Sequence, residues 1–236
     1  MDTKTRHALK HNALADTAQS GFDWLQENKG DVIRFVLIVV AVLALGIGGA
    51  VAYQHQQEQA QAAFGAAMED YLTPLAQSAT QEQPGMKTYP TAAARAKAAN
   101  AEFLKVADSN GWTEAGRNAE YFVGITYMEM GQTADAERTL QQVADHGNHN
   151  LAALAQMALA SIAQQAGRTS DAIQIYQRLA AHPTSTVPAS QAKLALAALY
   201  EQTNPQQAKQ LYAEIKDADK DTAAGQIATQ KLAQLH

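Results

Sequence analysis

Two close groupings of histidines are the residues in this chain whose types and spacing could bind a metal ion. One pairs His7 with His11, and the other places His149 shortly after Asp145-His146. Imidazoles three or four residues apart can share a metal, but a site needs a third ligand held in an ordered frame. The first pair lies in a polar N-terminal tail, and the second in a predicted loop between repeats. We therefore expect neither to be a metal site, and the sequence predicts no cofactor.

Enzyme signatures are missing from the sequence. It has no phosphate-binding glycine loop, no nucleophile elbow and no helical zinc-protease signature. It also has no cysteine, which excludes disulfides and thiolate chemistry. Adjacent carboxylates such as Glu69-Asp70 face water more often than they act as acid and base. We therefore predict no catalytic residue, and an enzyme with an unrecognised site is the third hypothesis for function.

The composition indicates which type of secondary structure the chain forms. Alanine and glutamine are abundant, aromatic residues are only 6%, and β-branched residues are sparse outside one apolar segment. Because alanine and glutamine are good helix formers, the sequence predicts an all-α protein. The formal net charge of −5 falls on the part of the chain after that segment, and no basic face that could neutralise phosphates is evident. We therefore expect no binding to nucleic acid.

One segment is apolar enough to cross a membrane. From Phe35 to Tyr53 the chain runs for 19 residues without a charge, as FVLIVVAVLALGIGGAVAY. A helix of this length spans roughly 28 Å, close to the ~30 Å hydrocarbon core of a bilayer. Trp24 before the segment and Tyr53 at its end suit the membrane interfaces, where amphipathic rings accumulate. The sequence therefore predicts a transmembrane helix over residues 32–53.

The charges beside this helix predict its orientation. Lys29 and Arg34 stand close to the start of the apolar run, whereas no lysine or arginine follows it until Lys87. Cytoplasmic flanks of membrane helices carry an excess of lysine and arginine. We therefore expect residues 1–31 to form a cytoplasmic leader, and the chain from residue 54 onward to lie on the other side of the membrane.

A cleaved signal peptide is the alternative for this segment. Ala50-Val51-Ala52 offers small residues in the pattern that a signal peptidase reads. The apolar run is longer than that of a typical signal peptide, however, and a long polar leader precedes it. Both features favour a permanent anchor, and a mature chain beginning near Tyr53 would overturn this prediction.

Small residues share one face of the predicted membrane helix. Ala44, Gly48 and Ala52 follow one another at i, i+4 and i+8. Small residues so spaced allow close approach of two helices in lipid, so this face could contact a second copy, as in a homodimer, or another membrane protein. Glycine is also common in membrane helices without any such contact, and that alternative stays open.

After the membrane segment the sequence repeats itself. Three segments align without gaps at a spacing of 36 residues. In each, an alanine is followed four positions later by a large apolar residue: Ala136 and Leu140, Ala172 and Tyr176, Ala208 and Tyr212. Gly131 and Gly167 stand between the halves of the first two units, and Asn204-Pro205 takes their place in the third. Each unit therefore predicts two antiparallel helices that approach closely at the alanine and are joined by a tight turn.

The repeats resemble the tetratricopeptide pattern. The stretches GITYMEMGQTADAERTL and ASIAQQAGRTSDAIQIY carry its small residue, turn glycine, alanine and large apolar residue in order, whereas ALYEQTNPQQAKQLY departs at the turn. The resemblance implies an α-solenoid over residues 91–220, closed by a C-terminal capping helix over residues 221–236. A fainter copy containing Phe103 precedes these units. Its partner helix is expected at residues 55–78, within a spacer helix and linker that covers residues 54–90.

The whole layout resembles the YfgM family. A charged leader ends in FDWLQENKGDVI at the membrane segment, QHQQEQAQAAFGAAMEDY follows it, and degenerate repeats come after. Members of this family are ancillary subunits of the bacterial Sec translocon. The resemblance implies a single-pass protein of the bacterial inner membrane, with a cytoplasmic N-terminus and a periplasmic C-terminal domain. It also implies three kinds of partner: Sec translocon subunits, a periplasmic prolyl-isomerase-like chaperone and exported polypeptides.

A stack of helix pairs presents the first helix of each unit on its concave side. The inner positions of the tetratricopeptide pattern fall on ten residues of this chain, which form a predicted protein-binding groove: Asn118, Tyr121, Ile125 and Met128 in the first unit, Met157, Ser161 and Gln164 in the second, and Lys193, Ala197 and Tyr200 in the third. Methionine is flexible and polarizable, which suits surfaces that accept varied apolar sequences. Any of these residues could instead pack against a neighbouring unit, and this alternative stays open.

Together these features predict a non-catalytic, periplasmic protein-binding module that is tethered to the inner membrane and assists newly exported proteins at the Sec translocon. A structural scaffold for a cell-envelope assembly or division complex is the alternative. Fixed partners would favour the scaffold, whereas weak binding of many unfolded peptides would favour the chaperone.

Overall fold

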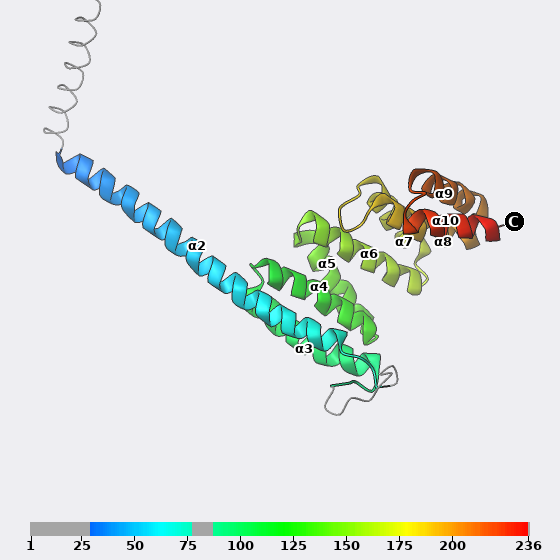
Figure 1. The fold of residues 1–236 in the computed structure, drawn as a ribbon, viewed down its shortest axis with the longest axis horizontal. Coiled ribbons are helices and arrows are strands. Elements are labelled where there is room, and N and C mark those ends of the chain that lie inside the picture. The colour runs from blue at the N-terminus through cyan, green and yellow to red at the C-terminus, as the bar shows by residue number, and fades with distance from the viewer. Residues whose placement is uncertain (1–28, 77–86, 236) are drawn as a thin grey trace, which may run out of the picture. The chain divides into compact units, whose positions relative to one another are not determined.

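The computed structural model describes residues 29–76 and 87–235, and most of these residues are helical. The described residues form nine α-helices, labelled as in Figure 1: α2 (Lys29–Leu72), α3 (Ala92–Asn110), α4 (Glu114–Glu129), α5 (Thr133–His146), α6 (His149–Gln165), α7 (Thr169–Ala181), α8 (Ala189–Thr203), α9 (Pro205–Ala218) and α10 (Ala223–Gln234). The predicted all-α fold class is confirmed.

Some predictions concern residues outside the described part of the chain. These residues are the leader up to residue 28, with the pair His7 and His11 and with Trp24, and the linker over residues 77–86. The expectations for them stay predictions.

The chain divides into two compact units between His55 and Gln56. The first unit contains the N-terminal part of α2, whose large apolar side chains from Ile33 to Val51 are exposed. The most apolar window of this helix has a mean hydropathy of 2.8, and none of it is buried. Among the described residues, α2 is the one helix that is long and apolar enough to cross a membrane. A signal sequence can meet the same criteria of length and composition. The exposure of α2 distinguishes it from the buried core helix of a soluble protein.

The second unit is a stack of helix pairs. α4 and α5, α6 and α7, and α8 and α9 are the first and second helices of three pairs, and each helix packs against the next along the chain (Figure 1). Gly131 between α4 and α5 has φ +73°, and Gly167 between α6 and α7 has φ +74°. A side chain is disfavoured in this left-handed conformation, which explains the glycine in both turns. In the third pair, Asn204 caps α9 by accepting the N–H of Gln207 at 3.3 Å, and Pro205 occupies the first turn.

The aligned small and large residues form the core of this stack. The repeated alanines are fully buried, and the large residues that follow them are at most 4% exposed: Ala136, Ala172, Ala208, Leu140, Tyr176 and Tyr212. On α4, a Cβ atom added to Gly124 would lie 2.6 Å from Cγ of Leu140 on α5. The two helices of the first pair can therefore approach this closely only because residue 124 has no side chain.

A fourth pair precedes these three and consists of the end of α2 with α3. Phe64 and Tyr71 of α2 face Phe103 of α3 and Phe122 of α4, with ring centroids 5.7 to 6.1 Å apart. Phe103 and the neighbouring Ala99 are fully buried in this cluster. The pairing expected for the faint upstream copy of the repeat is therefore confirmed.

The helix that pairs with α3 is shorter than the expected range of residues 55–78. It ends at Leu72, because Pro74 lacks an amide N–H and disfavours helical backbone in the residue before it. On the other side of the linker, Lys87 forms a 2.6 Å ion pair with Asp70. The two described ends of the linker thus stay close to the last turn of α2.

α10 covers the C-terminal end of the stack and packs against α9 and α8. Glu201 of α8 accepts a 2.6 Å hydrogen bond from the hydroxyl of Tyr212 on α9, and it forms a 3.0 Å ion pair with Lys231 on α10. The hydrogen bond from Tyr212 lowers the pKa of Glu201 below its ordinary value, and the nearby Lys231 lowers it further. One carboxylate therefore links three successive helices at this end of the array.

Candidate protein-binding surfaces

The first-helix face, defined as the predicted groove residues of α4, α6 and α8, differs from one helix to the next. On α4, Tyr121, Ile125 and Met128 are half-buried and pack against the apolar cluster of the first and second pairs. Their i, i+4 and i+7 spacing puts them on one stripe of the helix, with the half-buried Asn118 one turn earlier. The ring centroid of Tyr121 lies 5.3 Å from that of Phe122, and burial raises the pKa of the Tyr121 hydroxyl.

On α6 the predicted residues are more polar. Met157 is half-buried and packs against the cluster of the second and third pairs. The hydroxyl of Ser161 accepts a 3.3 Å hydrogen bond from Nε2 of Gln165, and Gln164 is exposed. Because α4 and α6 are in contact, an apolar stripe and a polar one lie on neighbouring helices.

On α8 the structure differs from the prediction. Ala197 is fully buried and Tyr200 is only 7% exposed, and both belong to the C-terminal apolar cluster. The Tyr200 hydroxyl accepts a 3.2 Å hydrogen bond from Nε2 of Gln177 on α7, and Lys193 forms a 2.8 Å ion pair with Glu214 on α9. Ala197 and Tyr200 therefore pack inside the array rather than line an open surface, because α7, α9 and α10 all cover α8.

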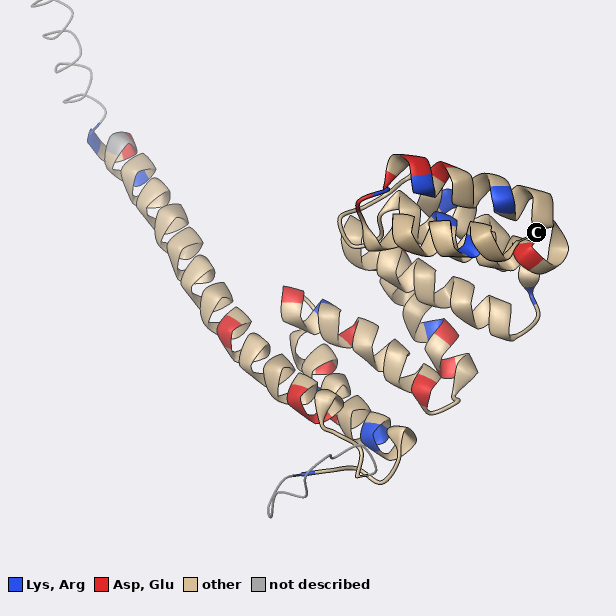
Figure 2. Cartoon of the chain, turned by 45° about the vertical axis from the view of Figure 1, so that its right-hand side comes forward, with Lys and Arg blue, Asp and Glu red and all other residues tan. Residues whose placement is uncertain are grey.

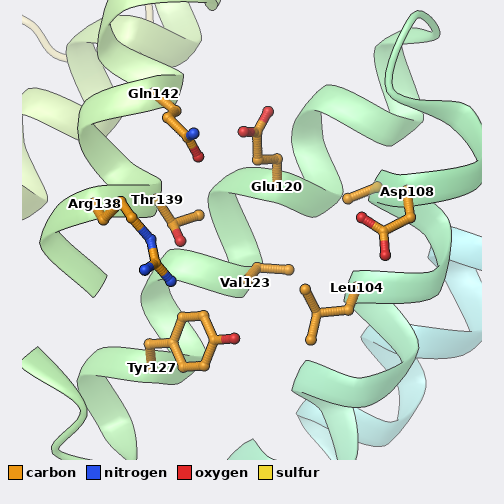
Figure 3. Close-up of a pocket in the computed structure, with 9 residues that line it drawn as sticks. Leu104, Asp108, Glu120, Val123, Tyr127, Arg138, Thr139 and Gln142 are labelled. Carbon is orange, nitrogen blue, oxygen red and sulfur yellow. The ribbon is translucent and has the colours of Figure 1, made fainter. Parts of the chain in front are cut away.

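A second surface lies on the side of the second helices. A pocket of about 280 Å³ opens between α3, α4 and α5 (Figure 3). Leu104 and Val123 give it an apolar wall. Arg138 enters from α5, whereas Glu120 and Asp108 belong to α4 and α3, as Figure 3 shows. The pocket thus joins apolar surface to charges of both signs, a combination suited to holding a charged side chain of a partner.

The electrostatics of this pocket involve the second histidine grouping. Burial raises the pKa of Glu120 above the ordinary range of a glutamate, and the neighbouring His146 acts in the opposite direction. Asp145 accepts a 2.9 Å hydrogen bond from Gln141. His146 is the last residue of α5 and His149 is the first of α6, so the grouping is divided between two helices.

A further pocket of about 380 Å³ lies between α5, α6 and α7. Arg168 and Glu137 form an ion pair at this pocket, and Leu159 and Ile175 also line it. Sequence reasoning missed both pockets because it followed only the first helix of each unit. Glu137 directly follows the buried, repeated Ala136. A charged residue at that position is the sequence signal that could have revealed the surface on the side of the second helices.

The small residues of the apolar segment are accessible in the single chain. Ala44, Gly48 and Ala52 are exposed, and a Cβ atom added to Gly48 would meet no atom within 4 Å. Figure 2 shows a long uncharged stretch of α2, which the sequence bounds by Arg34 and Glu58. The role of these residues as a contact face stays a prediction.

A comparison with protein families agrees with this architecture. The family model described as tetratricopeptide repeat-like domain matches residues 22–179, more than half of the chain. Among solved structures, the putative kinesin light chain nearly identical TPR-like repeats of Podosopora anserina and a variant of it are each 17% identical, with a TM-score of 0.48, covering 60% of this chain and 77% of that chain. No curated protein gives a significant match. The chain belongs to the tetratricopeptide repeat-like domain family.

Proposed function

We propose that this chain is a non-catalytic protein-binding module, tethered to the bacterial inner membrane by the N-terminal part of α2, whose repeat array assists newly exported polypeptides at the Sec translocon. Stacked helix pairs of this kind present extended binding surfaces, which supports a role in protein–protein interaction. The proposed partners are translocon subunits, a periplasmic prolyl-isomerase-like chaperone and the exported chains themselves.

The observation that carries the proposal is the half-buried apolar stripe of Tyr121, Ile125 and Met128, with Met157 on the adjacent helix. A client segment laid along this stripe would bury the apolar area that is still exposed, at about 25 cal/mol per Å². Methionine adapts its shape to different neighbours, so such binding tolerates varied sequences. Weak binding of many apolar segments is what a helper of newly exported chains requires.

The proposed location rests on the charges and the exposure of α2. Lys29 and Arg34 stand near the start of the exposed apolar run, and no further lysine or arginine follows until Lys87. Lipid would cover the exposed side chains, and the excess of basic residues would keep the N-terminus in the cytoplasm. The array would then lie on the periplasmic side.

A scaffold for a cell-envelope assembly or division complex is the second candidate. The pockets on the side of the second helices favour it, because their charged groups, such as Arg138 and Glu120, suit one partner of fixed sequence. A fixed partner would bind there with a defined stoichiometry and would not be displaced by unrelated apolar peptides.

Binding of the full chain to an array of apolar peptides tests the proposal. We expect Tyr121→Ala combined with Met157→Ala to weaken binding roughly tenfold, because each truncation removes an apolar side chain from the surface. The matched control is Tyr127→Ala combined with Ile175→Ala, which removes half-buried residues of the same kind at the two pockets. Equal binding by the two double variants, at equal thermal stability, would refute the role of the first-helix face.

Affinity purification from mild detergent, followed by mass spectrometry, tests the specific location. We expect translocon subunits and a periplasmic prolyl-isomerase-like chaperone to co-purify with the full chain. Their consistent absence would defeat the translocon role and leave the binding module intact. Recovery of a division or assembly complex instead would favour the scaffold.

A further inference from the structure

Trp112 is a large side chain of the array that stays exposed. It is 54% exposed, in the loop between α3 and α4. Thr113 caps α4 by accepting the N–H of Gly116 at 3.0 Å, and its hydroxyl donates to the carbonyl of Asn110 at 2.8 Å. Nη1 of Arg117 donates to the carbonyl of Trp112 at 3.0 Å. These bonds hold the backbone of the loop at Trp112 in one shape.

The same loop is bonded to the part of α2 that begins the second unit. Nε2 of Gln56 donates to Oδ1 of Asn110 at 2.5 Å, and Oε1 of Gln57 accepts the backbone N–H of Glu114 at 3.2 Å. Tyr53, the last residue of the apolar run, precedes Gln56 by three residues. Three residues of chain reach at most about 11 Å, however the backbone bends. A bilayer spanned by the apolar run would therefore end within reach of this loop.

We propose that Trp112 inserts into the head-group region of the bilayer on the side of the array, and so docks the array on the lipid surface. This proposal rests on the membrane anchoring proposed above for α2. An indole combines a large apolar ring with an N–H donor, and tryptophan accumulates at the membrane interface for that reason. The charges that flank the loop in the sequence are of both signs, with Glu114 and Arg117 following Trp112 and Glu58 following Gln57. The contact is therefore with the interface itself and not with anionic lipid in particular.

Fluorescence quenching in lipid nanodiscs tests the proposal on the full chain. The chain has two tryptophans, so Trp24→Phe leaves Trp112 as the sole tryptophan. Nanodiscs contain lipids spin-labelled near the head group or deep in the acyl chain, in zwitterionic or in anionic bilayers. We expect the shallow label to quench Trp112 roughly twofold and the deep label to quench it less, in both kinds of bilayer.

The matched control moves the tryptophan to the other end of the stack. In a chain with Trp24→Phe and Trp112→Phe, Ile227→Trp places an emitter on α10, where residue 227 is 46% exposed, and we expect no quenching there. Flotation of the same samples with vesicles reports the anchor separately. A chain that floats but shows no quenching of Trp112 overturns this inference alone, whereas a chain that does not float overturns the anchor and this inference together. An indole that the lipid labels do not quench, but whose emission shifts when translocon subunits are added, would identify a protein as the occupant and also overturn the lipid contact.

Discussion

Gly124 shows how a single residue decides whether two helices of the array fit together. A Cβ atom there would lie 2.6 Å from Cγ of Leu140, whose side chain is fully buried and cannot move aside without disturbing its own neighbours. The repeat places Ala160 and Leu196 at the equivalent positions of the next two units. The repeat pattern predicts close approach of the two helices in every unit, and in the first pair the contact at residue 124 additionally requires glycine.

Gly124→Ala is predicted to destabilise the array. Alanine favours a helix by about 1 kcal/mol over glycine, but overpacking a core costs about 1–3 kcal/mol, so we expect a net loss of about 1 kcal/mol in the free energy of unfolding. Gly65→Ala is the control, because Gly65 lies in α2 with no atom near the position of its absent Cβ. Urea denaturation should show Gly65→Ala gaining up to about 1 kcal/mol. A gain from Gly124→Ala would mean that the two helices are further apart than described.

Glu120 gives a prediction about pH at the same scale. Because burial raises its pKa in the folded state, the folded protein disfavours the charged carboxylate, and stability falls as the pH rises from the ordinary glutamate pKa of about 4.3 through the raised value. Glu120→Gln removes this penalty. We expect the variant to have the higher free energy of unfolding at neutral pH and to equal the parent below about pH 4. A variant that is less stable at neutral pH would indicate a favourable ion pair with His146 instead.

At the scale of elements, both ends of the array use the same arrangement. A tyrosine hydroxyl donates to a glutamate that also faces a cation, in the sets Tyr71, Glu129 and Arg95 at one end and Tyr212, Glu201 and Lys231 at the other. Each set ties together three successive helices. At the first end, Nε of Arg95 and Oε2 of Glu129 are buried without a hydrogen bond, so that set depends more heavily on its tyrosine.

Tyr71→Phe is predicted to loosen α2 from α3 and α4. The hydroxyl of Tyr71 donates a 2.5 Å hydrogen bond to Oε1 of Glu129, and burial raises the pKa of Tyr71 well above its ordinary value. Without this bond, the charged partner that remains to the Glu129 carboxylate is Arg95, at 3.7 Å. We expect the free energy of unfolding, measured by thermal denaturation, to fall by about 1–2 kcal/mol. Tyr121→Phe is the control, and we expect it to change stability by less than about 0.5 kcal/mol. Equal effects of the two substitutions would argue against the Glu129 contact.

Sequence reasoning succeeded where local chemistry decides the structure and failed where burial by distant helices decides it. The turn glycines, such as Gly131, followed from the need for a left-handed backbone, and the buried alanines followed from their spacing. The repeat pattern assigns Tyr200 to the groove, with packing against a neighbouring unit as the alternative, because it gives the same role to every unit. In the structure α10 and its neighbours cover α8, and a repeat at the end of a stack therefore differs from one in its middle.

At the scale of the whole molecule, one helix serves two kinds of surroundings. The part of α2 up to Tyr53 exposes apolar side chains, and the part after Gln56 buries Ala60 and Ala67 and packs Phe64 against the array. Hydropathy predicted the first part. The faint upstream copy of the repeat predicted that the second part pairs with the helix containing Phe103. The individual aromatic contacts involve residues far apart in the sequence, and the repeat pattern did not predict them.

Leu43→Arg is predicted to weaken the anchor. Residue 43 is 59% exposed near the middle of the apolar run, and an arginine at the centre of a membrane helix costs about 2.5–3.5 kcal/mol on insertion. We expect the fraction of the chain that resists extraction from membranes by alkaline carbonate to fall, while Leu43→Phe leaves it unchanged. Equal extraction of the parent and of both variants would show that this run does not span the bilayer.

Site-specific photo-crosslinking in cells tests most directly the claim that the first-helix face receives exported chains. A photo-reactive residue would replace either Gln164, exposed on α6, or Gln141, exposed at the pocket between α5, α6 and α7. We predict crosslinks to many newly exported polypeptides from position 164 and few or none from position 141. Crosslinks to a single fixed partner from position 141, with none from position 164, would contradict the account and favour the scaffold.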